Sequence, residues 1–235
     1  MNLLGGNKMN VTVYGDSILR GVRFQEGRYV IDHSWEDRLA ETFGLAITNR
    51  SRFGNTIQKA MPRIERDSAE ACGGEDWALL ELGGNDCDYD WAAVAEAPEA
   101  EHLCKTPPAT FMDYYRRAIR LLRASGRKVV LATLPPINSE LYLRFLCRDG
   151  LNRENIVRWL GDVEHIYRWQ ESYSEMVERL AREERVPLID LRSAFLRDFR
   201  RPEALLCADG IHPSMQGQDL IFRTLSDFAR ALFGV

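Results

Sequence analysis

Cysteine is scarce in this chain, and its spacing follows no metal-binding or disulfide pattern. The 235 residues include five cysteines, an odd number, and no two of them form a Cys-x-x-Cys pair. This argues against both a disulfide framework and a thiolate zinc site. We therefore expect reduced and at least partly buried thiols at Cys72, Cys87, Cys104, Cys147 and Cys207.

The chain also lacks an excess of positive charge and a long hydrophobic run. Lys and Arg number 31 against 35 Asp and Glu, for a formal net charge of -4, which argues against nucleic acid as the main partner. No apolar run approaches the ~20 residues of a membrane-spanning helix, and the first residues lack the apolar region of a signal peptide. We therefore predict a cytoplasmic protein without a membrane span.

The composition that remains is typical of a soluble globular protein, with 45% hydrophobic and 28% charged residues. No internal repeat, low-complexity linker or domain boundary is visible in the sequence. The length suits one large core. We therefore predict a single domain over residues 1–235.

Five short apolar runs alternate with amphipathic segments along the chain. This alternation is typical of a parallel sheet covered by helices on both faces, an α/β fold. Segment 23–33 is predicted as a loop or small hairpin, 87–108 as irregular, and 137–161 as an insertion with short helices. Capping boxes predict helix starts at Ser34 and Thr110, Gly44 and Gly126 are expected to close those helices, and Ser214 is predicted to cap the last helix. The predicted strands are 11–14, 45–48, 77–82, 128–134 and 186–191, and further helices are expected over 56–66 and 162–185.

The first strand leads into Gly15, Asp16 and Ser17, followed by what resembles a helical turn. Ligands of open α/β sheets gather outside the carboxyl ends of the strands. A serine hydroxyl in that crevice, close to free backbone N–H groups, suits a nucleophile. Serine is also a common helix cap, so this stretch alone supports either role for Ser17.

Further polar groups follow the other strands of the predicted sheet. Asn85 follows the third strand, and Asp209 and His212 lie between the fifth strand and the last helix. Acyl transfer from an ester needs a nucleophile, a base and donors aimed at the oxyanion. Ser17 and His212 supply the first two, and Asp209, three residues before His212, is close enough to orient its ring. The candidate donors are the backbone N–H groups of Ser17 and Gly54 and the side-chain amide of Asn85.

In these residues the chain resembles the SGNH hydrolases, also called GDSL-type esterases. Four blocks match in order: Gly15-Asp16-Ser17-Ile18, Asn49 to Thr56 with Gly54 in the key place, Gly83-Gly84-Asn85-Asp86, and Asp209-Gly210-Ile211-His212. Ile18 replaces the usual Leu, and the second block is the loosest match. The resemblance implies a three-layer α/β/α fold with a flavodoxin-like five-stranded sheet. It also implies a Ser17-His212-Asp209 triad, an oxyanion hole of Ser17, Gly54 and Asn85, and no metal or cofactor.

The expected function is that of a serine esterase acting on a small-molecule ester with a short acyl group, including acetyl groups on carbohydrate. Lysophospholipase, thioesterase and acyltransferase activities of the same site stay open, as does a catalytically silent binding protein. The insertion over 137–161 has no counterpart in the family's motifs. Its apolar residues favour burial against the mouth of the active site or, alternatively, against another subunit of a homo-oligomer.

Other candidate site residues have simpler explanations. Asp86, Asp88 and Asp90 alternate like calcium ligands, but the glycine and glutamate of an EF-hand loop are absent. Three aromatic residues either line an acyl pocket or pack in the core or an oligomer interface. These residues are Trp159, Tyr167 and Trp169. The remaining histidines, at 33, 102 and 165, have no ligand-like spacing.

Overall fold

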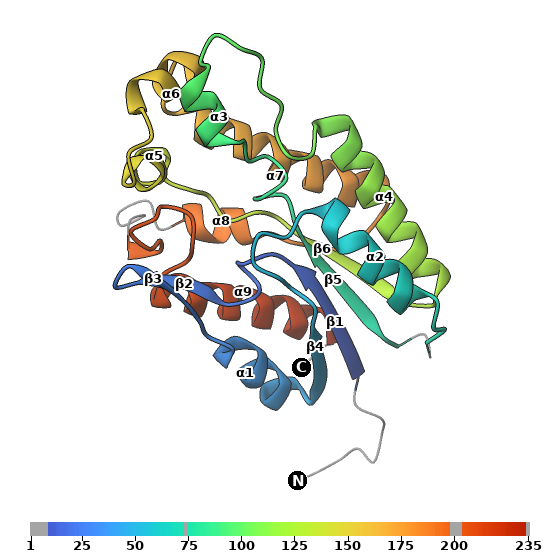
Figure 1. Cartoon of the computed structure of the whole chain (residues 1–235). Helices are drawn as coiled ribbons and strands as arrows, with labels where there is room; N and C mark the ends of the chain where they lie inside the picture. The colour runs from blue at the N-terminus through green and yellow to red at the C-terminus, as the bar shows by residue number, and fades with distance from the viewer. Residues whose placement is uncertain (1–8, 73–74, 198–203, 234–235) are drawn as a thin grey trace.

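The computed structural model describes residues 9–72, 75–197 and 204–233, and its centre is a five-stranded parallel sheet (Figure 1). The order across the sheet is β4-β1-β5-β6-β7, and every neighbouring pair is parallel. This confirms the predicted α/β fold with a flavodoxin-like strand order. The strands are β1 (Met9–Gly15), β4 (Leu45–Asn49), β5 (Trp77–Glu81), β6 (Lys128–Ala132) and β7 (Leu188–Ile189).

Helices cover both faces of the sheet and form the outer two layers (Figure 1). Side chains alternate between the faces along β5: Ala78 and Leu80 join the core under α2, α4 and α7, whereas Trp77 and Leu79 join the core under α1, α8 and α9. None of the described helices has the length and apolar character of a membrane span. The helices are α1 (Ser34–Phe43), α2 (Ile57–Ser68), α3 (Trp91–Glu96), α4 (Pro108–Ala124), α5 (Ser139–Cys147), α6 (Arg153–Leu160), α7 (His165–Glu183), α8 (Leu191–Leu196) and α9 (Met215–Phe233).

The strand order locates the site. From β1 the chain crosses to β4 on one side and then to β5 on the other, so the direction of winding reverses between β1 and β5. A crevice opens outside the carboxyl ends of the strands at such a switch point. Ser17 follows β1 and Asn85 follows β5, so both side chains belong to this crevice.

The predicted start of α1 at Ser34 is confirmed, but the capping boxes at Ser34 and Thr110 are wrong. α1 begins at Ser34 itself, after His33, and has no side-chain cap; Asp32 instead accepts a hydrogen bond from the Ser34 N–H at 2.9 Å. α4 begins at Pro108, two residues before Thr110, because proline has a preset helical φ and needs no partner at the first position. Gly44 ends α1 in the left-handed conformation as expected. Gly126 closes α4 as expected, directly after the cap residue Ser125, with a φ of +92° and its N–H bonded to the Arg123 carbonyl at 2.9 Å.

Several short elements differ from the prediction. Two six-residue helices, α3 and α8, were missed; Asp90 and Asp190 accept backbone hydrogen bonds at their starts. Because α8 starts so early, β7 has only two residues. Segment 23–33, predicted as a loop or small hairpin, is a hairpin, with β2 (Val22–Gln25) antiparallel to β3 (Arg28–Ile31). At the last helix, Ser214 accepts a hydrogen bond from the Gly217 N–H as predicted.

Candidate active site

Ser17 lies in a tight turn directly after β1. At Gly15 a Cβ would come within 2.8 Å of Ser51 Oγ, so the close approach of two loops requires glycine there. The Asp16 carboxylate accepts a hydrogen bond from the Ile18 N–H at 2.8 Å and holds the turn in shape. Ser17 is therefore fixed at the strand end and is 7% exposed.

Three polar side chains from opposite ends of the chain form a hydrogen-bonded row. Ser17 Oγ lies 3.0 Å from His212 Nε2, and His212 Nδ1 lies 2.6 Å from Asp209 Oδ2. A carboxylate only accepts hydrogen bonds, so Nδ1 carries the proton and Nε2 accepts the bond from the Ser17 hydroxyl. These distances fall within the range in which a histidine activates a hydroxyl nucleophile.

The loop that carries His212 and Asp209 has its own support. The other Asp209 oxygen accepts hydrogen bonds from the N–H groups of Ile211 and His212, at 3.2 and 3.1 Å. Gly210 has a φ of +74°, and a Cβ there would meet the Tyr142 backbone nitrogen at 2.6 Å. The sequence Asp-Gly-Ile-His therefore forms a turn that fits closely against the start of α5.

Asn85 is held beside Ser17 by the neighbouring carboxylate. Its Nδ2 donates a hydrogen bond to Asp16 Oδ2 at 3.1 Å. Gly84 leaves room for this contact, since a Cβ there would lie 3.3 Å from the same oxygen. One Nδ2 hydrogen is used by Asp16, and the other is available for a substrate oxygen.

Gly54 lies in the loop that follows β4. It has a φ of +68°, which favours glycine. The next residue, Asn55, donates from its side chain to the Gly15 carbonyl at 3.0 Å and ties this loop to the Ser17 turn. The preceding ring, Phe53, stacks on the His212 imidazole with 5.7 Å between centroids. The four sequence blocks therefore meet at one edge of the sheet.

A cavity of about 100 Å³ opens beside the serine and has Ser17, Asn85 and His212 in its wall. Most of its other lining is apolar and comes from the loops after β1, β5 and β6, from α3, α5 and α7, and from the loop that carries His212. These apolar lining residues are Ile18, Tyr89, Trp91, Leu134, Pro135, Ile137, Tyr142, Ile166, Trp169 and Ile211.

Of the three aromatic residues that the sequence offered for an acyl pocket, the cavity includes Trp169 alone. Trp159 packs its ring on Tyr89 at 4.8 Å between centroids, behind the cavity wall. Tyr167 donates a hydrogen bond to Glu171 at 3.2 Å. From the insertion, α5 contributes Tyr142 to the cavity wall.

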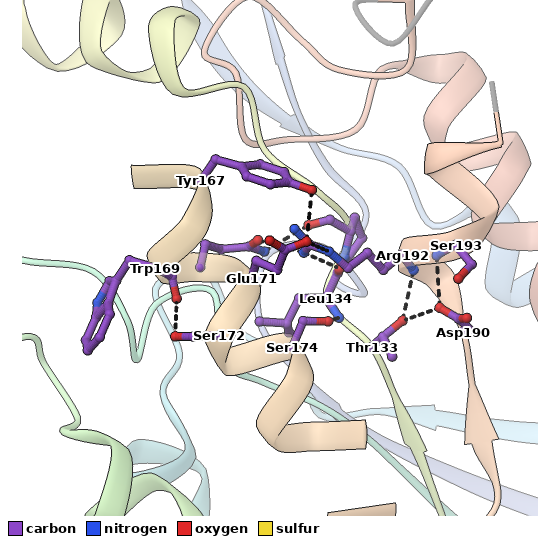
Figure 2. Close-up of polar contacts among 12 residues, drawn as sticks. Thr133, Leu134, Tyr167, Trp169, Glu171, Ser172, Ser174, Asp190, Arg192 and Ser193 are labelled. Atoms are coloured by element: carbon purple, nitrogen blue, oxygen red, sulfur yellow. Dashed lines mark hydrogen bonds and ion pairs between the residues drawn. The ribbon is translucent and has the colours of Figure 1, made fainter. Parts of the chain in front are cut away.

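Figure 2 shows a polar network around Arg192, behind the cavity wall. The sequence did not predict this network. Arg192, at the start of α8, donates to Gln170 Oε1 at 2.8 Å and to the Leu134 carbonyl at 3.3 Å. Gln170 in turn donates to the Pro135 carbonyl at 2.9 Å and lines the cavity. The network fixes the loop after β6 against α7. Only the packing of α7 and α8 brings these residues together, so no local motif could reveal them.

The alternating aspartates after β5 have separate structural partners. Both Asp86 oxygens accept the N–H of Ile57, at 3.0 and 3.2 Å, and hold the start of α2. Asp88 accepts hydrogen bonds from the side chains of Trp91, Tyr142 and Lys105, at 2.7, 3.0 and 2.7 Å. Asp90 caps α3.

Three buried carboxyl groups lie at or just beneath the site. Burial raises the pKa of Asp16 to about 6 and that of Asp86 to about 7. Burial, together with the nearby Asp16 charge, raises the pKa of Glu81 well above its usual range. Desolvation dominates at all three because each is removed from water.

Comparison with known proteins gives one consistent result. A family model described as the GDSL-like lipase/acylhydrolase family matches residues 13–220. None of the curated proteins gives a significant match.

One solved structure with this fold is a lipase/acylhydrolase from Enterococcus faecalis, which has 18% sequence identity to this chain and a TM-score of 0.61. The match covers 95% of this chain and 96% of that chain. A member of the lipolytic protein G-D-S-L family from Veillonella parvula has 19% identity, coverage of 94% and 99%, and a TM-score of 0.63. A catalytic mutant of an acetylxylan esterase from Geobacillus stearothermophilus has 19% identity, coverage of 94% of both chains, and a TM-score of 0.64.

Proposed function

Because this chain belongs to the GDSL-like lipase/acylhydrolase family and is a serine hydrolase of ester bonds, we propose that Ser17, His212 and Asp209 are its catalytic triad. Ser17 Oγ attacks the ester carbonyl carbon while His212 Nε2 takes the hydroxyl proton. Asp209 holds the ring and stabilises the imidazolium. The observation that supports this proposal most strongly is the row of contacts, 3.0 Å from Ser17 to His212 and 2.6 Å from His212 to Asp209.

The negative charge of the tetrahedral intermediate falls on the former carbonyl oxygen. The proposed donors to it are the N–H groups of Ser17 and Gly54 and the free Nδ2 hydrogen of Asn85. His212 then gives its proton to the leaving alcohol, and an acyl group stays on Ser17. In the second half, His212 takes a proton from water, the hydroxide attacks the acyl carbon, and Ser17 Oγ leaves and recovers the proton.

The cavity supports a short acyl group. Its volume is about 100 Å³ and its wall is mostly apolar, which suits a small apolar group next to Ser17. The fold shared with an acetylxylan esterase supports acetyl groups on carbohydrate as the substrate class. A cytoplasmic location stays a prediction from the sequence.

The decisive experiment combines covalent labelling with an ester panel. The wild type should react with a fluorophosphonate and should hydrolyse acetate to butanoate esters faster than hexanoate esters. Ser17→Ala should lose labelling and lower turnover by several orders of magnitude. Ser226→Ala, at a buried serine of α9, is the matched control and should keep both. Labelling that persists in Ser17→Ala would contradict the assignment, and a wild type that neither labels nor turns over would favour a silent binding protein.

A further inference from the structure

Two large aromatic side chains beside the catalytic histidine are left exposed. Tyr29 and Phe53 are 41% and 56% exposed, whereas His212 is only 2% exposed. The Phe53 ring lies nearly parallel to the imidazole, at 16°, and the Tyr29 ring meets it at 65° with 5.2 Å between centroids. The Tyr29 and Phe53 rings pack against each other with 4.9 Å between their centroids. They form a corner of apolar surface over the outer side of His212, which we call the aromatic corner.

The fold holds this corner in place. Tyr29 lies on β3, directly opposite Phe24 on β2. Glu26 and Gly27, both with positive φ, make the tight turn between the strands. Phe24 packs edge-on against Phe145 of α5 at 5.1 Å. The hairpin is therefore held by α5 through Phe24 and by the contacts of Tyr29 with Phe53 and His212, so Tyr29 has a fixed place beside the histidine.

The reaction itself distinguishes the two sides of Ser17. His212 must protonate the leaving oxygen, so the alcohol part of the ester has to lie on the histidine side. The apolar cavity extends from Ser17 and Asn85 towards Trp169, and neither Tyr29 nor Phe53 lines it. The acyl chain therefore suits the cavity, and the alcohol is directed towards the aromatic corner.

The chemistry of the corner indicates which alcohol it fits. The Tyr29 and Phe53 rings lie at an angle to each other, so a flat ring of the substrate can contact the face of one and the edge of the other. A flexible linear alcohol would bury less surface there and would lose more rotational freedom. The Tyr29 hydroxyl has no hydrogen-bond partner among the described residues, and burial with the nearby Asp209 charge raises its pKa above the usual value. It is therefore a protonated group available to a hydroxyl-bearing ring.

We propose that Tyr29 and Phe53 form the alcohol subsite and select a cyclic polyol, a sugar ring, as the leaving group. This proposal rests on the proposed esterase function and adds the residues that choose the alcohol. A sugar has the apolar C–H face that lies on an aromatic ring and the hydroxyl edge that Tyr29 can bind. Exposed apolar surface next to a reaction centre is a common mark of ligand binding.

The test compares three acetates that differ in the alcohol alone: a singly acetylated methyl xylopyranoside, phenyl acetate and ethyl acetate. In Phe53→Ala and Tyr29→Ala, the ratio of kcat/KM for the sugar ester to that for ethyl acetate should fall about threefold to tenfold. Tyr29→Phe keeps the ring and should lower kcat/KM for the sugar ester but not for phenyl acetate. Ile31→Ala, an exposed apolar residue on the same strand, is the control and should leave the ratio unchanged.

Unchanged ratios in both alanine variants would overturn the proposal, as would equal losses on all three esters, which would mean that the rings serve only to position His212. A loss on phenyl acetate without a loss on the sugar ester would overturn the assignment to sugars in favour of aryl alcohols. A wild type that hydrolyses none of the three acetates would overturn the proposed function together with this proposal. Normal ethyl acetate hydrolysis with an unaltered sugar ratio would overturn this proposal alone.

Discussion

At the scale of single residues, the Asp16 carboxylate links two parts of the proposed machinery. One oxygen holds the Ser17 turn through the Ile18 N–H, and the other orients Asn85. Asn85 therefore presents its free N–H without having to reorganise when charge develops on the substrate. Preorganised donors of this kind account for a large share of catalysis in acyl transfer.

Asn85→Ala should lower kcat by roughly 10²–10³, or about 3–4 kcal/mol, with little change in KM, because the lost donor acts mainly in the transition state. Steady-state kinetics on a short-chain ester measure this. Asn155→Ala is a matched control, since the Asn155 side chain binds the Ala95 carbonyl away from the cavity. A loss confined to KM would mean that Asn85 binds the ground state instead.

The pH profile should report Asp16. With a pKa of about 6, Asp16 becomes neutral as the pH falls through 6, and its charge-assisted hydrogen bond to Asn85 weakens. Asp16→Asn has no carboxyl proton to gain in this range, so its kcat/KM should fall less steeply with falling pH than that of the wild type. Identical slopes would mean that Asp16 does not titrate in this range.

The proposed catalytic residues could be predicted from the sequence because each belongs to a short motif at a strand end or in the turn before the last helix. The parallel sheet brings such ends together whatever the details of packing. Gln170 and Arg192 could not be found in this way, since their positions depend on how α7 and α8 pack behind the cavity. The stacking of Phe53 on His212 likewise depends on the path of the loop after β4.

At the scale of elements, the sequence predicts long periodic segments well and local start signals only in part. The alternation of strands and helices follows from burial, which acts over the whole segment. Helix starts are decided by competition among neighbouring residues. α4 begins at Pro108 instead of Thr110, whereas α1 begins at Ser34 as predicted, although Asp32 accepts the Ser34 N–H in place of a capping box. Six residues, as in α3 and α8, are too few for a periodic pattern to emerge.

The contact between α5 and the histidine loop gives a prediction at this scale. Gly210→Ala has to place a Cβ 2.6 Å from the Tyr142 nitrogen and 2.8 Å from the Asn138 carbonyl oxygen. It should lower stability by about 1–3 kcal/mol beyond the backbone strain and should reduce kcat, since α5 and the His212 loop must separate.

Gly44→Ala is the control for this change. Gly44 has a φ of +66° in the left-handed region, and a Cβ there meets nothing within 4 Å. It should show the cost of positive φ alone, about 1–2 kcal/mol. Thermal or urea unfolding of the two variants measures the difference. If both variants lose the same stability and keep the same activity, α5 moves away from the Gly210 turn at no measurable cost.

At the scale of the whole molecule, the fold keeps three carboxyl groups out of water near the edge of the sheet that carries Ser17. Asp16, Glu81 and Asp86 all have a pKa above the ordinary value because of burial. In the unfolded chain these groups ionise near pH 4. Between that pH and the raised pKa, the native state binds more protons than the unfolded state. Their contribution to stability is therefore complete below about pH 4 and is lost as the pH rises through the raised pKa.

Asp86→Asn isolates one of these contributions. The amide oxygen can still accept the Ile57 N–H, but it has no proton to lose. Because the native pKa of Asp86 is about 7, the unfolding free energy of the wild type relative to the variant should fall by about 4 kcal/mol between pH 4 and pH 8. Urea unfolding across this range measures it, and Asp113→Asn, at an exposed carboxyl, is the control for removing a charge. Parallel curves for the wild type and Asp86→Asn would show that Asp86 is ionised in the native protein throughout, with the Ile57 N–H stabilising its charge enough to offset burial.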